Sequence, residues 1–285
     1  MKLWISGSVG ATAFTNAMKG LNLEKATHAA LKEMGNLASI YEVGGIEITF
    51  PPIPPYCGPL GKVMMNSLSS AADIIAELMG LYRTSIHLPF GLMGSQISWE
   101  LMKTAIGLSI EVEEKSWGQI ERFVMHSSTI PLLTYLKRGD YSKASTLDSN
   151  VRNTITTCED AGIPLAIENL GDRMGFPGFS HLFKLPYAGG CYDICHAFIH
   201  GDDIKKEIAE HGKRILEFHI SDSLMTHGQR CNDTHCTFGR GNVPILEALD
   251  TIGSNAPNTP IVIEVQSGRS FEESINYLLI NNITI

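Results

Sequence analysis

The feature of this sequence that most constrains its fold is a regular alternation of short apolar runs with longer segments of helical periodicity. The runs are rich in β-branched and aliphatic residues, which is typical of buried strands. They cover residues 2–6, 45–50, 84–88, 122–126, 164–168, 190–193, 215–220 and 261–265. Strand–helix alternation builds parallel βαβ units, and eight strands favour a closed barrel because a doubly wound sheet usually has about five or six. We therefore predict an α/β fold, a single (β/α)8 TIM barrel over residues 1–285.

The length of the chain agrees with one barrel. Its 285 residues would suffice for one large domain or for two small ones, and single barrels of this type commonly have about 250 residues. The proline-rich segment 51–61 follows the second predicted strand, so we interpret it as a rigid loop and not as a domain linker. Helix ends are predicted at Gly80 and Gly162, because glycine readily adopts the left-handed conformation of a helix cap.

Charge and cysteine content bear on partners and compartment. The net charge of -8 gives no support for broad binding to nucleic acid or to anionic membranes. The six cysteines form no CxxC pair, which favours reduced thiols, and no apolar run approaches the ~18 residues of a membrane helix. Ser6, Gly7 and Ser8 interrupt the N-terminal apolar run too early for a signal peptide. We therefore expect a cytoplasmic protein without a membrane partner.

Ionisable residues stand at the carboxyl ends of six successive predicted strands, where the catalytic groups of a (β/α)8 barrel lie. A single histidine at such a place is more often a hydrogen-bonded packing residue than a ligand. Glu168 and Glu264 are more informative, because each ends an apolar run that has no arginine in its neighbourhood. A carboxylate in such surroundings needs a cation, a proton or several donors. We interpret the set as ligands of divalent metal ions: His87, His126, Glu168, Asp193, His219 and Glu264.

Two further segments add candidate ligands near the same end of the barrel. His196 lies one turn after Asp193 in "DICHAF", and both are expected to face the barrel mouth. In "CNDTHCTFGRG", Asp233 and His235 are two residues apart, which places both side chains on one face of an extended segment. A solvated surface turn is the alternative for this loop. The glycines of "GRG" lack the full dinucleotide fingerprint, and we interpret them as a turn.

Taken together, these motifs resemble the endonuclease IV group (AP endonuclease family 2) of the xylose isomerase-like TIM barrels. The resemblance runs along the whole chain in strand order. It is carried by "IHLPF" at 86–90, "AIENLG" at 166–171, "DICHAF" at 193–198, "FHISDS" at 218–223 and "DTHCTFGRG" at 233–241. The pair formed by "DICHAF" and "FHISDS…DTHCTFGRG" is the most specific part, whereas "IHLPF" or "GRG" alone would be weak.

The resemblance implies a site with two or three zinc ions, for which manganese is chemically possible as well. One ion would be held by His87, His126 and Glu168, a second by Glu168, Asp193, His219 and Glu264, and a third by His196, Asp233 and His235. It also implies hydrolysis of a phosphodiester at abasic sites in DNA, with Glu168 and Glu264 as the catalytic carboxylates. Divalent ions support such chemistry because they lower the pKa of water and neutralise charge on phosphate.

Two alternatives remain open from the sequence. In a sugar or sugar-phosphate isomerase or epimerase of the same superfamily, Glu168, Asp193, His219 and Glu264 would bind one ion and the two glutamates would move a proton. That alternative gains from a departure from the endonuclease IV pattern, since Phe90 and Gly91 follow "IHLP" where the family usually has tyrosine and a bulky apolar residue. The other alternative is a non-catalytic sensor or scaffold.

The residues expected to contact substrate are Phe90, His227 and Arg240.

Overall fold

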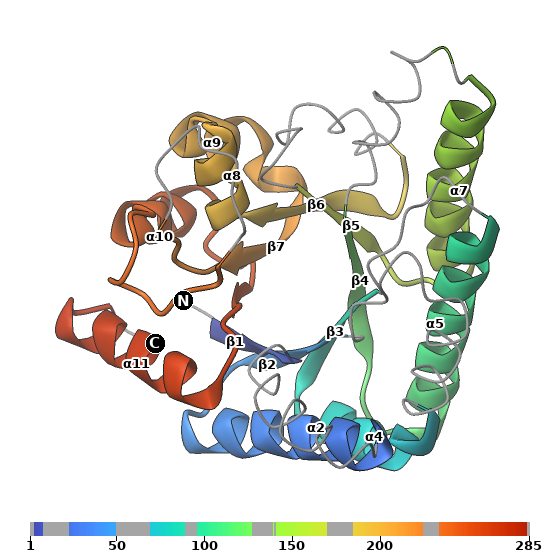
Figure 1. Ribbon diagram of the computed structural model, residues 1–285, viewed down its shortest axis with the longest axis horizontal. Coiled ribbons are helices and arrows are strands. Elements are labelled where there is room, and N and C mark those ends of the chain that lie inside the picture. The colour runs from blue at the N-terminus through green and yellow to red at the C-terminus, as the bar shows by residue number, and fades with distance from the viewer. Residues whose placement is uncertain are drawn as a thin grey trace.

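The strands of this protein close into a barrel, as predicted. The computed structural model describes residues 3–7, 23–49, 69–88, 96–126, 139, 141–169, 185–224 and 234–283. Within these ranges eight parallel strands follow one another around the barrel in chain order, and β8 pairs with β1 to close it (Figure 1). The strands are β1 (Leu3–Ser6), β2 (Gly45–Thr49), β3 (Arg83–His87), β4 (Ile120–His126), β5 (Leu165–Glu168), β6 (Ala188–Asp193), β7 (Ile215–Ile220) and β8 (Ile261–Ile263).

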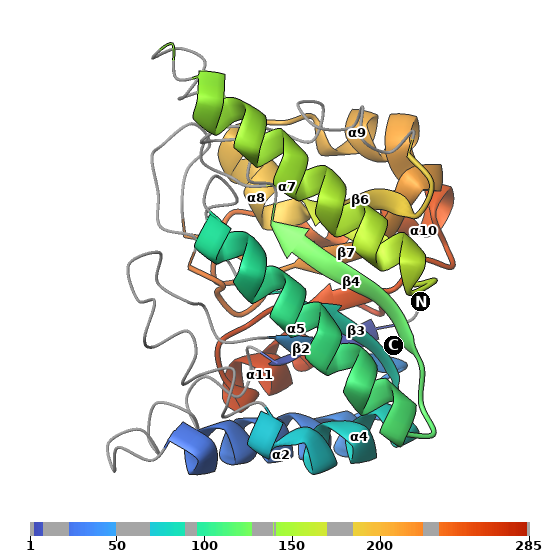
Figure 2. The same cartoon turned by 90° about the vertical axis from the view of Figure 1, so that its right-hand side faces the viewer.

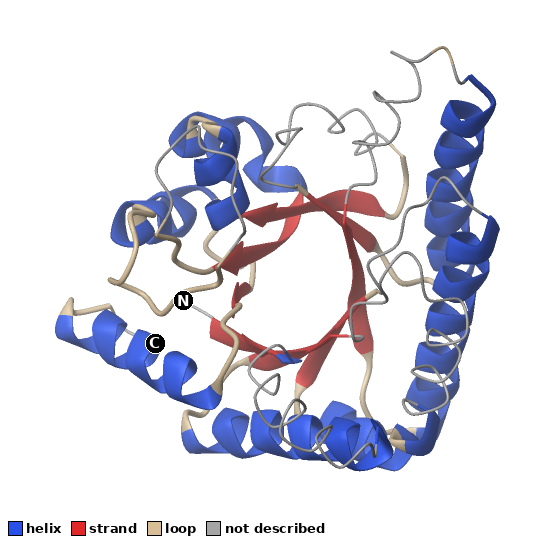
Figure 3. Ribbon diagram, in the orientation of Figure 1, coloured by secondary structure: helices blue, strands red, loops and turns tan. Residues whose placement is uncertain are grey.

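Helices lie outside the ring of strands (Figure 3). They are α2 (Leu23–Ile40), α4 (Ala72–Leu81), α5 (Gln96–Lys115), α7 (Tyr141–Asp160), α8 (Ile194–His200), α9 (Ile204–His211), α10 (Ile245–Asn255) and α11 (Gly268–Ile280), with a 3-10 turn, η4 (Gly212–Arg214), between α9 and β7. Figure 2 shows α5 and α7 running side by side along one wall of the barrel. No helix in these described ranges is long and apolar enough to cross a lipid bilayer.

The two faces of the strands have different environments. Phe123, Tyr192 and Phe218 belong to the large core between strands and helices. Val124, Ala166 and Cys191 form a separate small apolar cluster. Because neighbouring residues of a strand point to opposite faces, this cluster lies inside the barrel. Charged side chains occupy much of the rest of that interior, and they build the site.

Of the two predicted helix ends, the one at Gly162 is found in the structure and the one at Gly80 is not. Gly162 has a φ of +72° and follows α7, and the amide of the next residue, Ile163, donates to the carbonyl of Cys158 at 2.9 Å. This is the expected left-handed cap. The prediction for Gly80 is wrong, because α4 continues through it to Leu81 and ends at Tyr82 in extended conformation. Leu78 and Met79 are buried against the barrel, and this packing outweighs the low helix propensity of glycine.

Candidate metal centre

The barrel gathers the predicted ligands at the carboxyl ends of its strands. Eight of the nine lie in the described part of the chain, and Asp233 lies outside it. Glu168, Asp193 and His219 are completely buried, whereas His126 keeps about a quarter of its side chain exposed (23%). The strand register explains the gathering, since His126 pairs with Glu168 and Asp193 pairs with His219 across neighbouring parallel strands.

Glu168, the last residue of β5, lies at the centre of the cluster. Its Oε2 atom is 3.0 Å from Nε2 of His87 and 3.2 Å from Nε2 of His126. Its Oε1 atom faces another pair of imidazoles, 3.4 Å from Nδ1 of His196 and 3.5 Å from Nδ1 of His219. The two oxygens of one carboxylate thus serve two separate groups of side chains.

Two sets of potential ligands therefore share Glu168. In one set it joins His87 and His126; in the other it joins Asp193, His219 and Glu264, and in each set the ligand atoms lie within 4.8 Å of one another. The distance from His219 Nδ1 to Glu264 Oε2 is 3.3 Å. Both sets could bind a metal ion.

Asp193 and His196 owe their positions to the junction between β6 and α8. Asp193 is the N-cap of α8, and its Oδ1 accepts a hydrogen bond of 2.6 Å from the backbone amide of His196. The side chain of Asn169 fixes the backbone of Asp193 on both sides, accepting from its N–H at 2.7 Å and donating to its carbonyl at 2.9 Å. A capping aspartate one turn before a histidine explains why the two residues are three apart in the sequence.

Three imidazoles are oriented by backbone carbonyls. Nδ1 of His87 donates to Leu88 at 3.0 Å, Nδ1 of His196 to Asn169 at 2.7 Å, and Nδ1 of His235 to Glu264 at 3.0 Å. In each case Nε2 is the nitrogen left to serve as a ligand, an arrangement typical of metal-binding histidines. His235 also has a φ of +40°, a left-handed backbone that is uncommon for residues other than glycine and tends to occur at functional sites.

The buried polar atoms of the larger set fit a bound cation. Among the described residues, Glu168 Oε1, His219 Nδ1 and Glu264 Oε2 make no hydrogen bond of ordinary geometry, although His219 Nδ1 lies within 3.5 Å of both oxygens. Leaving such atoms buried without a partner is costly. Imidazole and carboxylate ligands together suit zinc and also manganese. The donor set is therefore appropriate for a divalent ion.

The ionisable groups of the cluster differ in the direction in which their pKa values are shifted. Burial lowers the pKa of His126 to about 4, which keeps its imidazole neutral and able to act as a ligand. For His87, burial opposes the charged form, but the hydrogen bond to Glu168 and the charge of Glu47 raise the pKa to about 9. For Glu264, burial is outweighed by the charges of His235 and His219, which lower the pKa to about 2. A cation at this site therefore competes with protons.

A family model described as a xylose isomerase-like TIM barrel matches residues 131–280, just over half of the chain. The protein belongs to this family. The sequence prediction of a xylose isomerase-like barrel is thereby confirmed. No curated protein matches the chain.

Several solved structures share the fold. An AP endonuclease of family 2 from Brucella melitensis is 13% identical over 98% of this chain and 99% of its own, with a TM-score of 0.64. A D-tagatose 3-epimerase-like protein is 18% identical over 99% of this chain and 98% of its own, with a TM-score of 0.61. A Thermus thermophilus protein, in a structure with ZnCl2 soaking, is 15% identical over 98% of this chain and 96% of its own, with a TM-score of 0.57. At these identities the likeness is one of fold.

A layer of charged residues lies beneath the cluster, and the sequence interpretation missed it. Glu47 Oε2 is 3.0 Å from Nε2 of His219, and Glu47 Oε1 accepts a hydrogen bond of 3.0 Å from the hydroxyl of Ser6. Burial raises the pKa of Glu47. Glu47 interrupts the apolar run "GIEITF", and this was the available signal. Although Glu47, His87 and His219 could hold an ion geometrically, His87 Nε2 already faces Glu168.

The sequence shows no arginine near Glu168 and Glu264, and among the described residues no arginine pairs with either of them. An arginine inside the barrel pairs with a different glutamate. Arg122 points into the barrel from β4 and pairs with Glu217 at 2.7 Å. It therefore balances Glu217 in the lower layer and not Glu168 or Glu264, which remain the carboxylates of the upper cluster. The contact joins residues on β4 and β7, so no local pattern in the sequence could have indicated it.

The substrate contacts expected from the sequence remain predictions. Phe90 and His227 lie outside the described residues. Arg240 is on the surface, where its guanidinium donates to Glu273 of α11 at 3.2 Å. The "GRG" segment is a turn, as predicted, because the amides of Gly239 and Gly241 both donate to Oδ2 of Asp222, at 2.9 and 2.8 Å.

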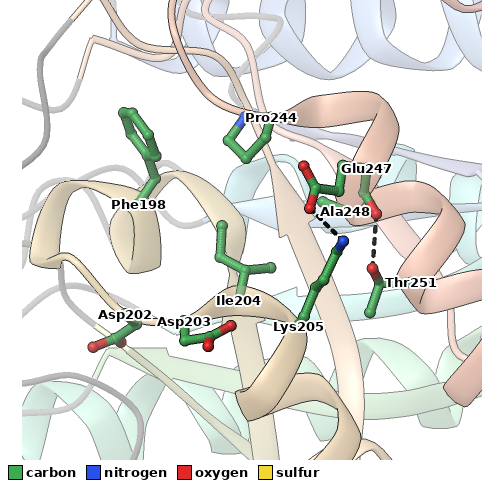
Figure 4. Close-up of a pocket in the computed structure, with 9 residues that line it drawn as sticks. All are labelled: Phe198, Asp202, Asp203, Ile204, Lys205, Pro244, Glu247, Ala248 and Thr251. Carbon is green, nitrogen blue, oxygen red and sulfur yellow. Dashed lines mark hydrogen bonds and ion pairs between the residues drawn. The ribbon is translucent and has the colours of Figure 1, made fainter.

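A separate pocket lies on the outside of the barrel, between α8, α9 and α10 (Figure 4). Its lining residues are Phe198, Asp202, Asp203, Ile204, Lys205, Pro244, Glu247, Ala248 and Thr251. Lys205 and Glu247 point toward each other in it and form an ion pair of 2.6 Å. None of these residues belongs to the predicted ligand set, so the pocket is distinct from the metal centre.

Proposed function

We propose that this protein is a metal-dependent phosphodiesterase of the endonuclease IV type, with more than one divalent ion, zinc or manganese, and with DNA containing abasic sites as its substrate. The observation that carries the proposal is the division of Glu168 between two ligand sets: Oε2 faces the imidazoles of His87 and His126, and Oε1 faces Nδ1 of His219. A carboxylate that bridges two ions presents its oxygens in this manner. The resemblance in the ligand motifs and the fold shared with an AP endonuclease support the choice of substrate.

Divalent ions bound at this cluster would supply activation of water and neutralisation of charge on a phosphoryl group. The residues of the chain would hold the ions in the cluster. Glu168 would join the two sets, while His87 and His126 on one side and Asp193, His219 and Glu264 on the other complete them. His196 and His235, with ring centroids 6.4 Å apart, would hold a third ion together with Asp233.

The orientation of the imidazoles prepares the site for this role. Because His87, His196 and His235 are tied to backbone carbonyls, their rings are already fixed before an ion binds. Preorganised ligands lose little conformational entropy on binding. The low pKa of His126, caused by burial, means that no proton has to leave that ring at neutral pH.

A sugar isomerase or epimerase is the second candidate. The observation that favours it is the group of Glu168, Asp193, His219 and Glu264, which offers four buried ligands to a single ion without help from other residues. A relative in fold is a D-tagatose 3-epimerase-like protein. Under this alternative His87 and His126 would not act as ligands, although both are within 3.2 Å of Glu168.

The metal content of the purified protein separates the two candidates. The phosphodiesterase should retain about three ions per chain and the isomerase about one. The change of His126→Ala should remove an ion and reduce activity by more than about 100-fold if the site is multinuclear, since a direct ligand matters at least as much as its neighbours. With a single ion in the four-residue set, His126→Ala should have little effect.

His200→Ala is the matched control, because His200 is a histidine at the end of α8 whose Nδ1 pairs with Asp202 at 2.7 Å, away from the cluster. Cleavage of a duplex with one abasic site tests the substrate directly. A fully loaded protein that leaves this duplex intact would refute the DNA assignment. Conversion of a ketose to its epimer by the same preparation would then establish the second candidate.

A further inference from the structure

His219 is anchored differently from the other imidazoles of the cluster. Its Nδ1 atom faces Glu168 and Glu264. Its Nε2 atom therefore points away from them, into the layer of charged residues beneath the cluster. There Nε2 donates to Oε1 of Glu217 at 3.3 Å, which is a side-chain carboxylate and not a backbone carbonyl. Glu217 and His219 are two residues apart on β7, and the period of a strand places both on the inner face.

Glu217 is itself held from two other sides. The guanidinium of Arg122 donates to its Oε2 at 2.7 Å, and the hydroxyl of Ser85 donates to its Oε1 at 3.3 Å. Glu217 is fully buried and Arg122 nearly so. Arg122 in turn lies over the ring of Trp4, with its Cζ 5.0 Å from the ring centroid. The carboxylate therefore has one orientation, fixed by charge and packing.

Glu47 is also close to His219, but it does not provide this anchor. Its Oε2 is 3.0 Å from Nε2 of His219, yet it makes no hydrogen bond of ordinary geometry within the described ranges. The N–H of His219 is directed to Glu217 and not to Glu47.

We propose that Glu217, locked in place by Arg122, is a positioning residue that fixes the ring and tautomer of His219 so that Nδ1 faces the cation site. This inference rests on the proposed function, because it assumes that the upper cluster binds a divalent ion. It assigns the buried Arg122–Glu217 pair a role in metal affinity and not only in folding. Partners of this kind, behind a ligand histidine, commonly contribute about 10- to 100-fold in affinity.

The change of Glu217→Gln tests the tautomer specifically. A glutamine has one carbonyl oxygen, which can accept from Arg122 or from His219 but not from both sides. Because the guanidinium is always charged, the oxygen should face Arg122, and the amide NH2 should face Nε2 of His219. That nitrogen must then accept, which moves the proton to Nδ1 and blocks the atom that faces Glu168 and Glu264.

The matched control is Glu121→Gln. Glu121 belongs to the same network, since it accepts from Arg122 Nη2 at 2.6 Å and also pairs with Arg83, but its contacts lie on the far side of Arg122 from His219. Zinc affinity is measured by competition with a chromophoric chelator, and cobalt is used to record the visible spectrum of the bound ion. Urea unfolding of the metal-free variants shows whether folding is affected equally.

We expect Glu217→Gln to bind zinc about 10- to 100-fold more weakly and to change the cobalt spectrum, whereas Glu121→Gln keeps the affinity and spectrum of the original protein. Unchanged affinity in folded Glu217→Gln would overturn the inference and leave the proposed function intact. If the original protein binds no divalent ion, both are overturned together.

A second variant covers the case in which Glu217→Gln does not fold. Arg122→Met combined with Glu217→Met removes both charges at once, and replacing a buried ion pair with apolar residues is often neutral for stability. Glu217 then no longer provides the acceptor for Nε2 of His219, while Glu47 Oε2 stays 3.0 Å from that nitrogen without the geometry of a hydrogen bond. The same loss of zinc affinity is expected, and full affinity would overturn the inference.

Discussion

Asp222 offers the sharpest test of how the loop that carries His235 is held. Its carboxylate is buried and accepts hydrogen bonds from four backbone amides. Oδ1 accepts from Ser223 at 2.8 Å and from Val243 at 3.0 Å, and Oδ2 accepts from Gly239 at 2.9 Å and from Gly241 at 2.8 Å. One side chain thus closes the segment between β7 and α10. We predict that Asp222→Asn destabilises the protein severely.

The magnitude follows from the number of acceptors that the substitution removes. Asparagine has a single side-chain oxygen, so in either orientation its NH2 group faces two of the four backbone donors. A hydrogen bond to a charged group contributes about 1.5–3 kcal/mol, so two lost bonds amount to about 3–6 kcal/mol. Domains are stable by only about 5–15 kcal/mol. Asp222→Asn should therefore remove a large share of the free energy of unfolding.

Urea unfolding of the chelator-treated protein measures this loss without a contribution from metal binding. The matched control is Asp203→Asn, because Asp203 caps α9 with one longer bond of 3.2 Å to the amide of Lys206 at an exposed position. That change should cost no more than about 1 kcal/mol. If Asp222→Asn were as mild as Asp203→Asn, the four-donor account of this loop would be refuted.

Four further predictions concern the barrel and its site. Gly45→Ala should destabilise by about 1–3 kcal/mol in urea unfolding, because a Cβ there would lie 2.4 Å from the ring of Trp4. Gly80→Ala, where a Cβ meets nothing within 4 Å, should not destabilise. The metal-free protein should lose up to about 3 kcal/mol of stability as pH rises from about 6.5 to about 9. In that range His87, whose pKa rises from 6.5 to about 9 in the folded state through its bond to Glu168, loses its proton; unfolding that is independent of pH there would contradict this. Finally, chelator should lower the melting temperature of zinc-loaded protein, and added zinc should restore it by mass action; no shift would argue against a bound ion.

Much of the fold was predictable because it depends on local signals. Apolar runs separated by helical segments fix the number of strands, and eight parallel strands have few alternatives to a barrel. The upper cluster was predictable for the same reason. Glu168 and Glu264 each follow an apolar run, and chain order places the ends of all parallel strands at one mouth. The boundaries were less certain, as β4 begins at Ile120 and β8 ends at Ile263, just before Glu264.

The lower layer was not predictable, because its partners meet only across the closed barrel. Glu217 and Arg122 are 95 residues apart in the sequence and lie on β7 and β4. The sequence of each strand does not show which of its faces points into the barrel, because that is set by the register when the barrel closes. Glu47 was visible as an acid within an apolar run, but its relation to His219 depends on strands β2 and β7, which are not neighbours in the barrel.

The way in which the imidazoles are anchored has a consequence for how this site tolerates mutation over evolutionary time. The carbonyl that orients His87 comes from the backbone of Leu88, and every amino acid would supply the same oxygen at that position. Drift in such neighbours leaves the ring orientation unchanged, so these parts of the centre are inherited with the backbone. His219 has no such protection, since its acceptor belongs to the side chain at position 217 and changes with it. At position 88 a change is therefore limited only by the packing of a buried core side chain, whereas a change at 217 has to be compensated elsewhere in the barrel.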